Sequence, residues 1–367
     1  MKFEIIETGY VYKTAIDCTD KVAVGSRCAV SSREEILCTF MIQKKLGGND
    51  FKPVLCRSFD HGKTWTKPNL IWPDLQDKFS IFGSISKGTN GEYLFFGQRT
   101  VIDKVGESFW CEATSGLKAN ELIWAKSCDN GATWSKFTVI PMPVPGAAEA
   151  PGAMCVARDG SWYCCYSPYK TFNPDIAVKI NQVIMLRSRD EGNTWEHKQM
   201  LTFDEPDSGG AESWITELGN STLLGMSWHF NRTSGADYPN AYSLSFDGGS
   251  SWQPTQASGL KGQSLALTPV IDDYALVVYN QRKNPPIGIW LALLKSNRKE
   301  FLIDANEIIW TAAIPGRNNT DTDHRQWTNF AFGEPSVTML QHNIILITFW
   351  CIQPDAQGIG FVKIRMK

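Results

Sequence analysis

Residues 58–65 read SFDHGKTW, and this stretch decides the fold because the chain repeats it. The same pattern, S-x-D-x-G-x-[ST]-W, returns at residues 127–134, 188–195 and 245–252. The aspartates of the four copies are 69, 61 and 57 residues apart. Self-similarity at spacings of this size indicates an array of similar structural units. We therefore predict a repeat protein.

Each position of the repeated pattern has a mechanical role at the tip of a β-hairpin. The aspartate closes the turn by accepting hydrogen bonds from the backbone amides that follow it. The glycine takes a conformation with positive φ, the Ser or Thr ties the returning strand, and the tryptophan buries a large face between neighbouring sheets. The pattern thus predicts four hairpin turns of one kind, and by itself it says little about chemistry.

A second repeat counts the units. Six segments share a small or acidic start, an apolar stretch, a short polar turn and a second apolar stretch, which is typical of a β-hairpin. These segments begin at residues 25, 82, 149, 211, 262 and 333 and end at residues 40, 99, 167, 228, 282 and 350. We expect them to be the two inner strands of six blades, with the repeated turns joining strands three and four of blades one to four.

The last two blades depart from this pattern. Blade five has Lys295-Ser296-Asn297-Arg298 where its repeated turn should be, and blade six has only one further strand, Ile359 to Arg365. We predict that the N-terminal segment around Phe3 to Tyr12 supplies the missing strand and closes the ring, which removes exposed sheet edges. The expectation is one all-β domain over residues 1–367, a six-bladed β-propeller.

Composition narrows the function classes. The formal net charge is −2, so nothing points to nucleic acid or to an anionic membrane surface as a partner. No stretch approaches the length of a transmembrane helix. We predict no metal and no cofactor, because no C-x-x-C pair or histidine cluster is present. The sequence gives no indication of an oligomeric state.

The cysteines and the N-terminus bear on the compartment. Most of the ten cysteines lie inside predicted strands, where a free cysteine behaves as a small hydrophobe. Residues 1–7 carry two acids where a signal peptide would need an apolar run. These features favour a reducing cytoplasm, or a secreted or periplasmic protein if the N-terminus was trimmed.

The repeated turn is the Asp-box, and the chain resembles the sialidase-like six-bladed β-propellers over nearly its whole length. Sialidases hold the carboxylate of a sugar with three arginines, whose fork-shaped donors match a planar carboxylate. They then use a tyrosine nucleophile activated by a glutamate, with an aspartate as acid and base. The resemblance therefore implies a carbohydrate partner and a site that can be sought residue by residue.

Strand order determines which residues can share that site. Within each blade, the start of strand one and the end of strand two lie on one face, and the Asp-box turn lies on the opposite face. Three carboxylates and several arginines at one mouth are costly to bury unless they pair or bind something. The residues expected to converge there are Arg27, Glu149, Glu212 and Glu334 from strand-one starts, and Arg99, Tyr166, Trp228, His229, Arg232 and Arg282 from strand-two ends.

The resemblance assigns some of these residues and leaves gaps. Arg27 stands where sialidases have the arginine of their F-R-I-P motif, Glu212 resembles the glutamate that partners the nucleophile, and Arg282 resembles the third arginine. Where the nucleophilic tyrosine is expected stands Glu334, and Asp50 is the only carboxylate in the blade-one loop that would offer the acid. Arg232 could take the place of the second of the three sialidase arginines only if the alignment of this chain with the family shifts by several residues.

We therefore predict a sialidase-like glycoside hydrolase that acts on a terminal acidic sugar, either sialic acid or a related 2-keto or uronic acid. Glu334 would attack or activate water, Glu212 would tune it, and Asp50 would be the acid. Arg27 and Arg282 would anchor the sugar. Further substrate-binding candidates are Arg232, Arg325, Arg99, Trp228, His229 and Trp214. Glu149 has no counterpart in the family, and we expect a hydrogen-bonded loop acid.

Two other functions stay open at this point. In the first, catalysis is absent and the funnel binds a glycan, with Trp214, Trp228 and Trp327 as stacking platforms. In the second, the protein is a lyase or hydrolase for uronic acids, with His229 or His324 as the base near neutral pH.

Overall fold

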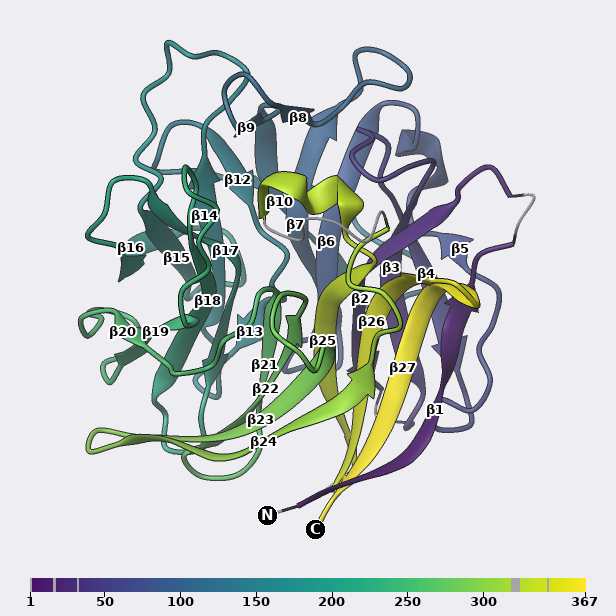
Figure 1. The fold of residues 1–367 in the computed structure, drawn as a ribbon, viewed down its shortest axis with the longest axis vertical. Helices are drawn as coiled ribbons and strands as arrows, with labels where there is room; N and C mark the ends of the chain where they lie inside the picture. Colours follow the sequence, from purple (N-terminus) through teal and green to yellow (C-terminus); the bar gives the residue numbers. More distant parts are fainter. Residues whose placement is uncertain (1, 16–17, 32, 318–323, 342) are drawn as a thin grey trace.

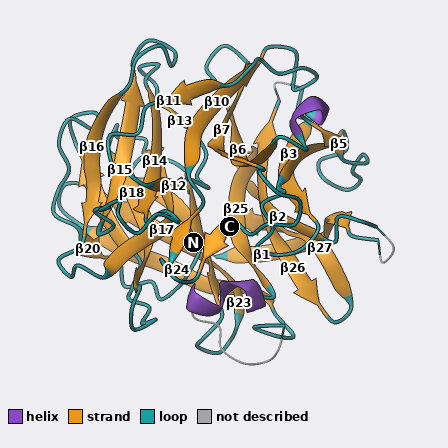
Figure 2. Ribbon diagram, turned by 90° about the horizontal axis from the view of Figure 1, so that it is seen from above, coloured by secondary structure: helices purple, strands orange, loops and turns teal. Residues whose placement is uncertain are grey.

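A computed structural model describes residues 2–15, 18–31, 33–317, 324–341 and 343–367. Over these ranges the chain forms six antiparallel sheets arranged as the blades of a propeller (Figures 1 and 2). Each blade has four strand positions, and the inner strand of blade three is divided in two. In blades one to five the strands follow one another along the chain from the axis outward, whereas the outermost strand of the last blade comes from the N-terminal segment. The predicted all-β, six-bladed fold is confirmed.

The first three blades span the N-terminal half of the chain. Blade one contains β2 (Val22–Val30), β3 (Ile36–Gln43), β4 (Lys52–Ser58) and β5 (Asn69–Leu70). Blade two contains β6 (Phe79–Lys87), β7 (Tyr93–Val101), β10 (Asn120–Ser127) and β11 (Thr138–Ile140). The inner strand of blade three is divided into β12 (Ala147–Glu149) and β13 (Cys155–Val156), followed by β14 (Trp162–Tyr169), β15 (Gln182–Ser188) and β16 (Glu196–Thr202).

Blades four and five repeat the arrangement. Blade four contains β17 (Ser208–Glu217), β18 (Leu223–Asn231), β19 (Ala241–Ser245) and β20 (Gln256–Ala257). Blade five contains β21 (Leu265–Pro269), β22 (Tyr274–Gln281), β23 (Gly288–Ser296) and β24 (Phe301–Thr311).

Blade six joins the two ends of the chain. Its strands are β25 (Phe332–Gln341), β26 (Ile344–Gln353), β27 (Ala356–Met366) and, on the outer edge, β1 (Phe3–Lys13). β1 pairs antiparallel with β27, from Phe3 opposite Met366 to Lys13 opposite Gly358. The N- and C-termini therefore lie side by side (Figure 1). The predicted closure of the ring by the N-terminal strand is confirmed.

The four repeated turns share one set of hydrogen bonds. In the first turn, the Asp60 carboxylate accepts from the Thr64 backbone amide at 2.9 Å and from the Thr64 hydroxyl at 2.6 Å. Gly62 has a φ of 83°, which a glycine adopts without steric cost. The equivalent turns follow β10, β15 and β19, as the pattern predicted. In blade five, Asn297 fills the role of the aspartate by accepting from the amides of Lys299 and Glu300.

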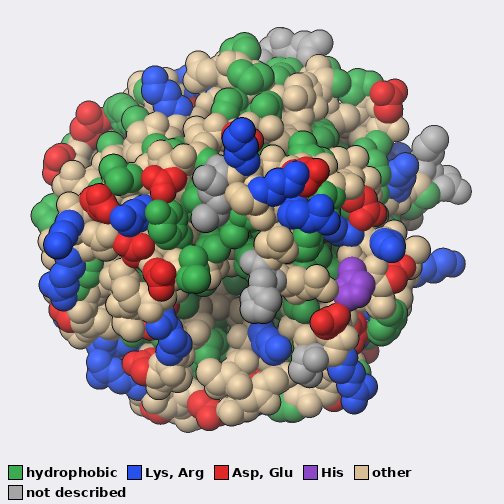
Figure 3. All heavy atoms as spheres, turned by 90° about the horizontal axis from the view of Figure 1, so that it is seen from below, with side chains coloured by type: hydrophobic (Ala, Val, Ile, Leu, Met, Phe, Trp, Pro, Cys, Tyr) green, Lys and Arg blue, Asp and Glu red, His purple; other side chains and the backbone are tan. Residues whose placement is uncertain are grey.

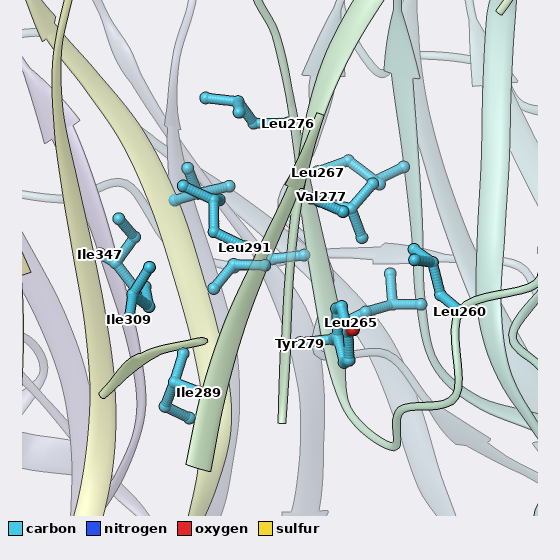
Figure 4. Packing of buried hydrophobic residues seen from close by; sticks show 14 of the residues in the cluster. Leu260, Leu265, Leu267, Leu276, Val277, Tyr279, Ile289, Leu291, Ile309 and Ile347 are labelled. Atoms are coloured by element: carbon cyan, nitrogen blue, oxygen red, sulfur yellow. The ribbon is translucent and has the colours of Figure 1, made fainter. Parts of the chain in front are cut away.

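The core consists of apolar side chains packed between neighbouring blades. The largest cluster joins blades four, five and six, and Figure 4 shows Leu276, Leu291 and Ile347 among its residues. These three side chains are fully buried, and each contributes about 1.5–3 kcal/mol relative to exposure. The strands carry apolar residues on both faces, because each blade is covered by a neighbouring blade on each side.

Two insertions interrupt the regular blades. The connection from β7 to β10 carries a short hairpin of β8 (Trp110–Cys111) and β9 (Gly116–Leu117). The connection from β24 to β25 carries the 3-10 helix η2 (His324–Asn329), and a second 3-10 helix, η1 (Pro73–Leu75), precedes blade two. Phe109 and Trp327 stack on each other with ring centroids 5.2 Å apart, so the β7–β10 and β24–β25 insertions meet in space.

The surface has no dominant charge. Figure 3 shows a face on which acidic and basic side chains intermingle around a hollow near its centre. Among the described residues, no helix combines the length and the apolar character needed to cross a bilayer.

Candidate functional site

A cavity of about 320 Å³ opens at the end of the propeller opposite the repeated turns. The strand register fixes this geometry. In blade four, Ala211 pairs with Trp228 near the cavity, whereas Glu217 pairs with Leu223 near the turn. Strand-one starts and strand-two ends therefore share one mouth, as the strand order predicted. The charged residues that line the cavity include Glu149, Glu212, Glu334, Arg232, Arg282 and Arg325.

Glu212 and Glu334 project from bulges in the inner strands of blades four and six. The register of β17 with β18 shifts between Ala211 and Trp214, and that of β25 with β26 shifts between Gly333 and Ser336. Within these bulges Glu212 has a φ of 51° and Glu334 a φ of 43°. Left-handed backbone is unfavourable for residues other than glycine, and bulges that redirect a side chain are common beside active sites.

One oxygen of each glutamate lacks a hydrogen-bond donor. Among the described residues, no group donates to Oε2 of Glu212 or to Oε2 of Glu334, although both atoms are shielded from bulk solvent. A buried carboxylate oxygen without a donor costs free energy. Both glutamates line the cavity, and a carboxyl oxygen without a donor is available to carry a proton.

Burial raises the pKa of both glutamates. Burial, followed by the charge of Glu212, raises the pKa of Glu334 to about 8, against the opposing charges of Arg27 and Arg282. Burial also raises the pKa of Glu212, and a hydrogen bond from Ser264 together with the two arginines works against that rise. Because the charge of Glu212 raises the pKa of Glu334, the two carboxyl groups titrate as one system.

Glu149 is a third carboxylate in the same cavity. Its two oxygens accept from the backbone amide of Glu212 at 3.2 and 3.0 Å, which satisfies the expectation of a hydrogen-bonded acid. Burial, followed by the charge of Glu212, raises the pKa of Glu149 well above its ordinary value. The shared strand-one position of Glu149, Glu212 and Glu334 was the sequence signal for its presence here.

Arg282 reaches the cavity from the end of β22 and is 3% exposed. Nε donates to the Phe332 carbonyl at 2.8 Å, and Nη1 donates to Oε1 of Gln263 at 2.7 Å. The guanidinium lies 3.8 Å from the ring centroid of Phe330. A Cβ on Gly333 would lie 2.1 Å from Nη2 of Arg282, so a side chain at position 333 would displace the guanidinium. Burial lowers the pKa of Arg282 to about 10, and the group stays cationic at neutral pH.

Arg27 lies beneath the cavity and does not line it. It is 2% exposed, and it donates to the carbonyls of Ser26 at 2.7 Å, Glu334 at 3.2 Å and Pro151 at 3.4 Å. Its guanidinium also lies 5.0 Å from the ring of Trp214. Both side chains border a second cavity of about 620 Å³ formed by the inner strands. The structure thus places Arg27 and Trp214 behind the glutamates.

Arg232, Arg325 and Trp228 do line the cavity. The Arg232 guanidinium lies 4.0 Å from the ring of Tyr169, and the Arg325 Nη1 donates to the Thr233 carbonyl at 3.2 Å. The indole nitrogen of Trp228 donates to Asp237 at 2.9 Å. The sequence missed Tyr169, because its strand position alone does not distinguish it from Tyr166.

Two of the predicted site residues in blades one and two lie outside the cavity lining. The Asp50 carboxylate turns back to accept from the Lys44 amide at 3.2 Å, and Leu46 and Phe51 line the cavity in its place. Arg99 pairs with Glu121 at 2.8 Å on the outer side of blade two. The structure does not bring these two groups together with the glutamates.

The predicted histidine bases have no described place in the cavity. His229 packs between the rings of Phe203 and Tyr238, with centroids 4.4 and 4.6 Å away, and it does not line the cavity. Burial lowers the pKa of His229 to about 4, so this histidine is neutral at pH 7. His324 begins η2, and its side chain lies outside the described part of the structure, as do residues 318–323.

The upper wall of the cavity is aromatic. We define the aromatic wall as Phe51, Phe82, Phe109, Trp110 and Trp327, all of which line the cavity. Within the described ranges, no group of three or more His, Cys, Asp or Glu side chains is arranged to hold a metal ion. The site therefore combines carboxylates and arginines at its floor with aromatic rings above them.

No protein-family model and no curated protein matches this sequence. Solved structures do match. A protein of unknown function from Dyadobacter fermentans DSM 18053 is 18% identical, with a TM-score of 0.77 over 100% of this chain and 99% of that chain. The Hadza microbial sialidase Hz136 is 14% identical, with a TM-score of 0.70 over 98% and 68%. The α-L-arabinanase of Penicillium chrysogenum, solved with arabinobiose, is 14% identical, with a TM-score of 0.63 over 99% and 98%. These matches show a sialidase-like six-bladed propeller, a fold shared by glycoside hydrolases.

Proposed function

We propose that this protein is a glycoside hydrolase that removes a terminal sugar residue by the action of Glu212 and Glu334. One observation carries the proposal. Two inner strands place these glutamates on strained bulges in the lining of one cavity, and one buried oxygen of each has no donor among the described residues. Glycosidases use a pair of carboxyl groups on either side of the scissile bond, one protonated and one ionised.

The pKa shifts favour a division of roles within the pair. Glu334, with a pKa of about 8, carries a proton at neutral pH and acts as the general acid. Its proton passes to the glycosidic oxygen as the bond from that oxygen to the anomeric carbon breaks. Burial also raises the pKa of Glu212, but a hydrogen bond from Ser264 and the charges of Arg282 and Arg27 oppose the rise. We therefore assign the second role to Glu212, which attacks the anomeric carbon or takes a proton from the attacking water. The sequence predicted instead that Glu334 attacks or activates water, that Glu212 tunes it and that Asp50 is the acid.

The predicted acidic sugar is part of this proposal. Arg232, Arg282 and Arg325 line the cavity, and Nη2 of Arg282 has no acceptor among the described residues after its other two nitrogens are bonded. A guanidinium beside a cavity is a suitable partner for a sugar carboxylate. Arg27 contributes through the backbone carbonyl of Glu334 and positions the acid.

The test is release of free sugar from a panel of glycosides. The panel contains 4-methylumbelliferyl glycosides of N-acetylneuraminic acid, D-glucuronic acid and L-arabinose. Wild type should release one of the acidic sugars, and Glu334→Gln should reduce that rate by about 10²- to 10⁴-fold without lowering the melting temperature. Release of arabinose alone would support the proposed hydrolase activity and contradict the proposal that the substrate carries an acidic sugar. Silence across the panel, together with thermal stabilisation by free sugar, would leave a glycan-binding protein without catalysis.

A further inference from the structure

We propose that the aromatic wall binds the leaving group of the substrate, and that this group presents a flat apolar ring. The inference rests on the proposed hydrolase function and specifies the part of the substrate that is released. The glutamates belong to the inner strands at the floor of the cavity, whereas the wall comes largely from the insertions above them. A terminal sugar that reaches the glutamates must therefore direct its aglycone toward the wall.

The rings of the wall touch one another in sequence. Phe109 lies 5.2 Å from Trp327 at an interplanar angle of 29° and 5.3 Å from Phe51. Trp327 lies 6.5 Å from Trp110 in an edge-to-face arrangement, and Phe51 lies 5.2 Å from Phe82 in the same way. These centroid distances are those of favourable aromatic pairs. The wall already stacks rings on rings, and one further ring fits its chemistry.

Three polar side chains beside the wall are bonded within the protein, whereas Oε1 of Gln43 and Nε1 of Trp110 in the same lining have no hydrogen-bond partner among the described residues. The amide of Asn120 donates to the Ala148 carbonyl and accepts from the Ala148 amide, both at 2.8 Å. Lys118 pairs with Asp103 at 2.8 Å and with Glu107 at 2.6 Å. Gln98 accepts from the Ala150 amide at 2.9 Å. A second sugar would require partners for its hydroxyl groups, and these three side chains have their bonds already.

Two leaving groups of similar reactivity separate binding at the wall from chemistry. The probes are methyl and benzyl glycosides of N-acetylneuraminic acid, D-glucuronic acid and L-arabinose, since both leaving groups are simple aliphatic alcohols. For a sugar that the enzyme releases, the benzyl glycoside should have a KM about tenfold lower than the methyl glycoside. The two kcat values should agree within about twofold, because a contact made equally in ground and transition states lowers KM alone.

Variants assign the difference to particular rings. Trp327→Ala and Phe109→Ala should each remove most of the benzyl advantage while the KM of the methyl glycoside changes by less than about twofold. Phe109→Leu keeps apolar bulk without a ring and serves where the alanine variant does not fold. Phe59→Ala is the matched control, since Phe59 is 72% exposed on the first repeated turn at the far end. This control should retain the full advantage.

Binding to an inactive variant separates this inference from the proposed function. Calorimetric titration of Glu212→Gln with the same methyl and benzyl glycosides reports the wall without turnover. Tighter binding of the benzyl glycosides supports the inference even if the wild-type protein cleaves none of the six compounds. Absence of cleavage would contradict only the proposed hydrolase activity. Equal KM and equal Kd for the two series would overturn the inference. Tighter binding of a disaccharide of the same sugar than of its benzyl glycoside would also overturn it, because the wall would then be a second sugar subsite.

Discussion

At the turn end of the propeller, the Asp129 carboxylate accepts from the Ser127 hydroxyl at 2.9 Å and from the Thr133 amide at 2.8 Å. At the cavity end, Glu334 has an oxygen that receives no donor from the described residues. Hydrogen bonds from Thr133 lower the pKa of Asp129 to about 2, whereas burial and Glu212 raise that of Glu334 to about 8. The same functional group is therefore satisfied at one end and left unsatisfied at the other. Carboxylates that stabilise a fold have donors, and carboxylates available for chemistry lack them.

Substitution of a cavity glutamate gives the largest expected difference between the two ends. Glu212→Gln should lower kcat/KM by about 10²- to 10⁴-fold. The fold should persist, because the amide keeps the shape of the side chain and removes a charge that is costly to bury. The measurements are steady-state rates with the released glycoside and the melting temperature. Retention of wild-type activity would exclude Glu212 from the reaction.

The pH dependence of stability should have opposite signs at the two ends. The pKa of Glu334 is raised from 4.5 to about 8, so its stabilising effect is full below the unfolded pKa and is lost as the pH rises through the folded value. The pKa of Asp129 is lowered from 3.8 to about 2, so its effect is present above the unfolded pKa and is lost as the pH falls. Melting temperatures should show that Glu334→Gln flattens the profile between about pH 4.5 and 8, and that Asp129→Asn flattens it between about pH 3.8 and 2. Identical profiles for both variants would contradict the comparison.

Removal of a turn aspartate should affect stability without affecting activity. The Asp247 carboxylate accepts from the Ser245 hydroxyl at 2.9 Å and from the amide and hydroxyl of Ser251 at 2.9 and 2.6 Å. Asp247→Ala should lower the free energy of unfolding by about 1–2 kcal/mol, since each such bond contributes modestly. Denaturant titration measures this, and kcat/KM should stay within about twofold. A large loss of activity in a folded variant would mean that the two ends are coupled.

The smallest effect is expected at Arg99. Its ion pair with Glu121 lies outside the cavity lining. Arg99→Ala should change the free energy of unfolding by about 0.2–1 kcal/mol, as for other exposed pairs. The KM for an acidic glycoside should not change. An increase in that KM would indicate that Arg99 binds the substrate, as the sequence predicted.

The sequence predicted the turn end well because its interactions are local. Asp60 and Thr64 are four residues apart, and the pattern that joins them can be read directly along the chain. The partners of Arg27 are 124 and 307 residues away, at Pro151 and Glu334. The family resemblance located the arginine in its blade, but only the folded ring determines that its donors meet backbone carbonyls.

The blade-one loop shows a second limit of sequence reasoning. Asp50 could reach the cavity only if its loop folded inward. The loop is instead tied to the insertion of blade two, where Asn49 donates to the Val101 carbonyl at 2.9 Å and to the Glu107 carboxylate at 2.7 Å. These contacts join two loops of different blades, and no pattern within either loop indicates them. For the same reason the aromatic wall could not be predicted, because its rings come from separate segments.

The pairing of β1 with β27 has a consequence for the order of events during synthesis. Among the strands of the propeller β1 is made first and its partner β27 is made last, and Lys2 and Lys367 exchange backbone hydrogen bonds at 3.1 and 2.9 Å. Until translation reaches β27, blade six is incomplete and β1 has no partner in the nascent chain. Exposed strands of this kind are sites of aggregation. The newly made chain therefore depends on protection of β1 until β27 is made and the ring can close.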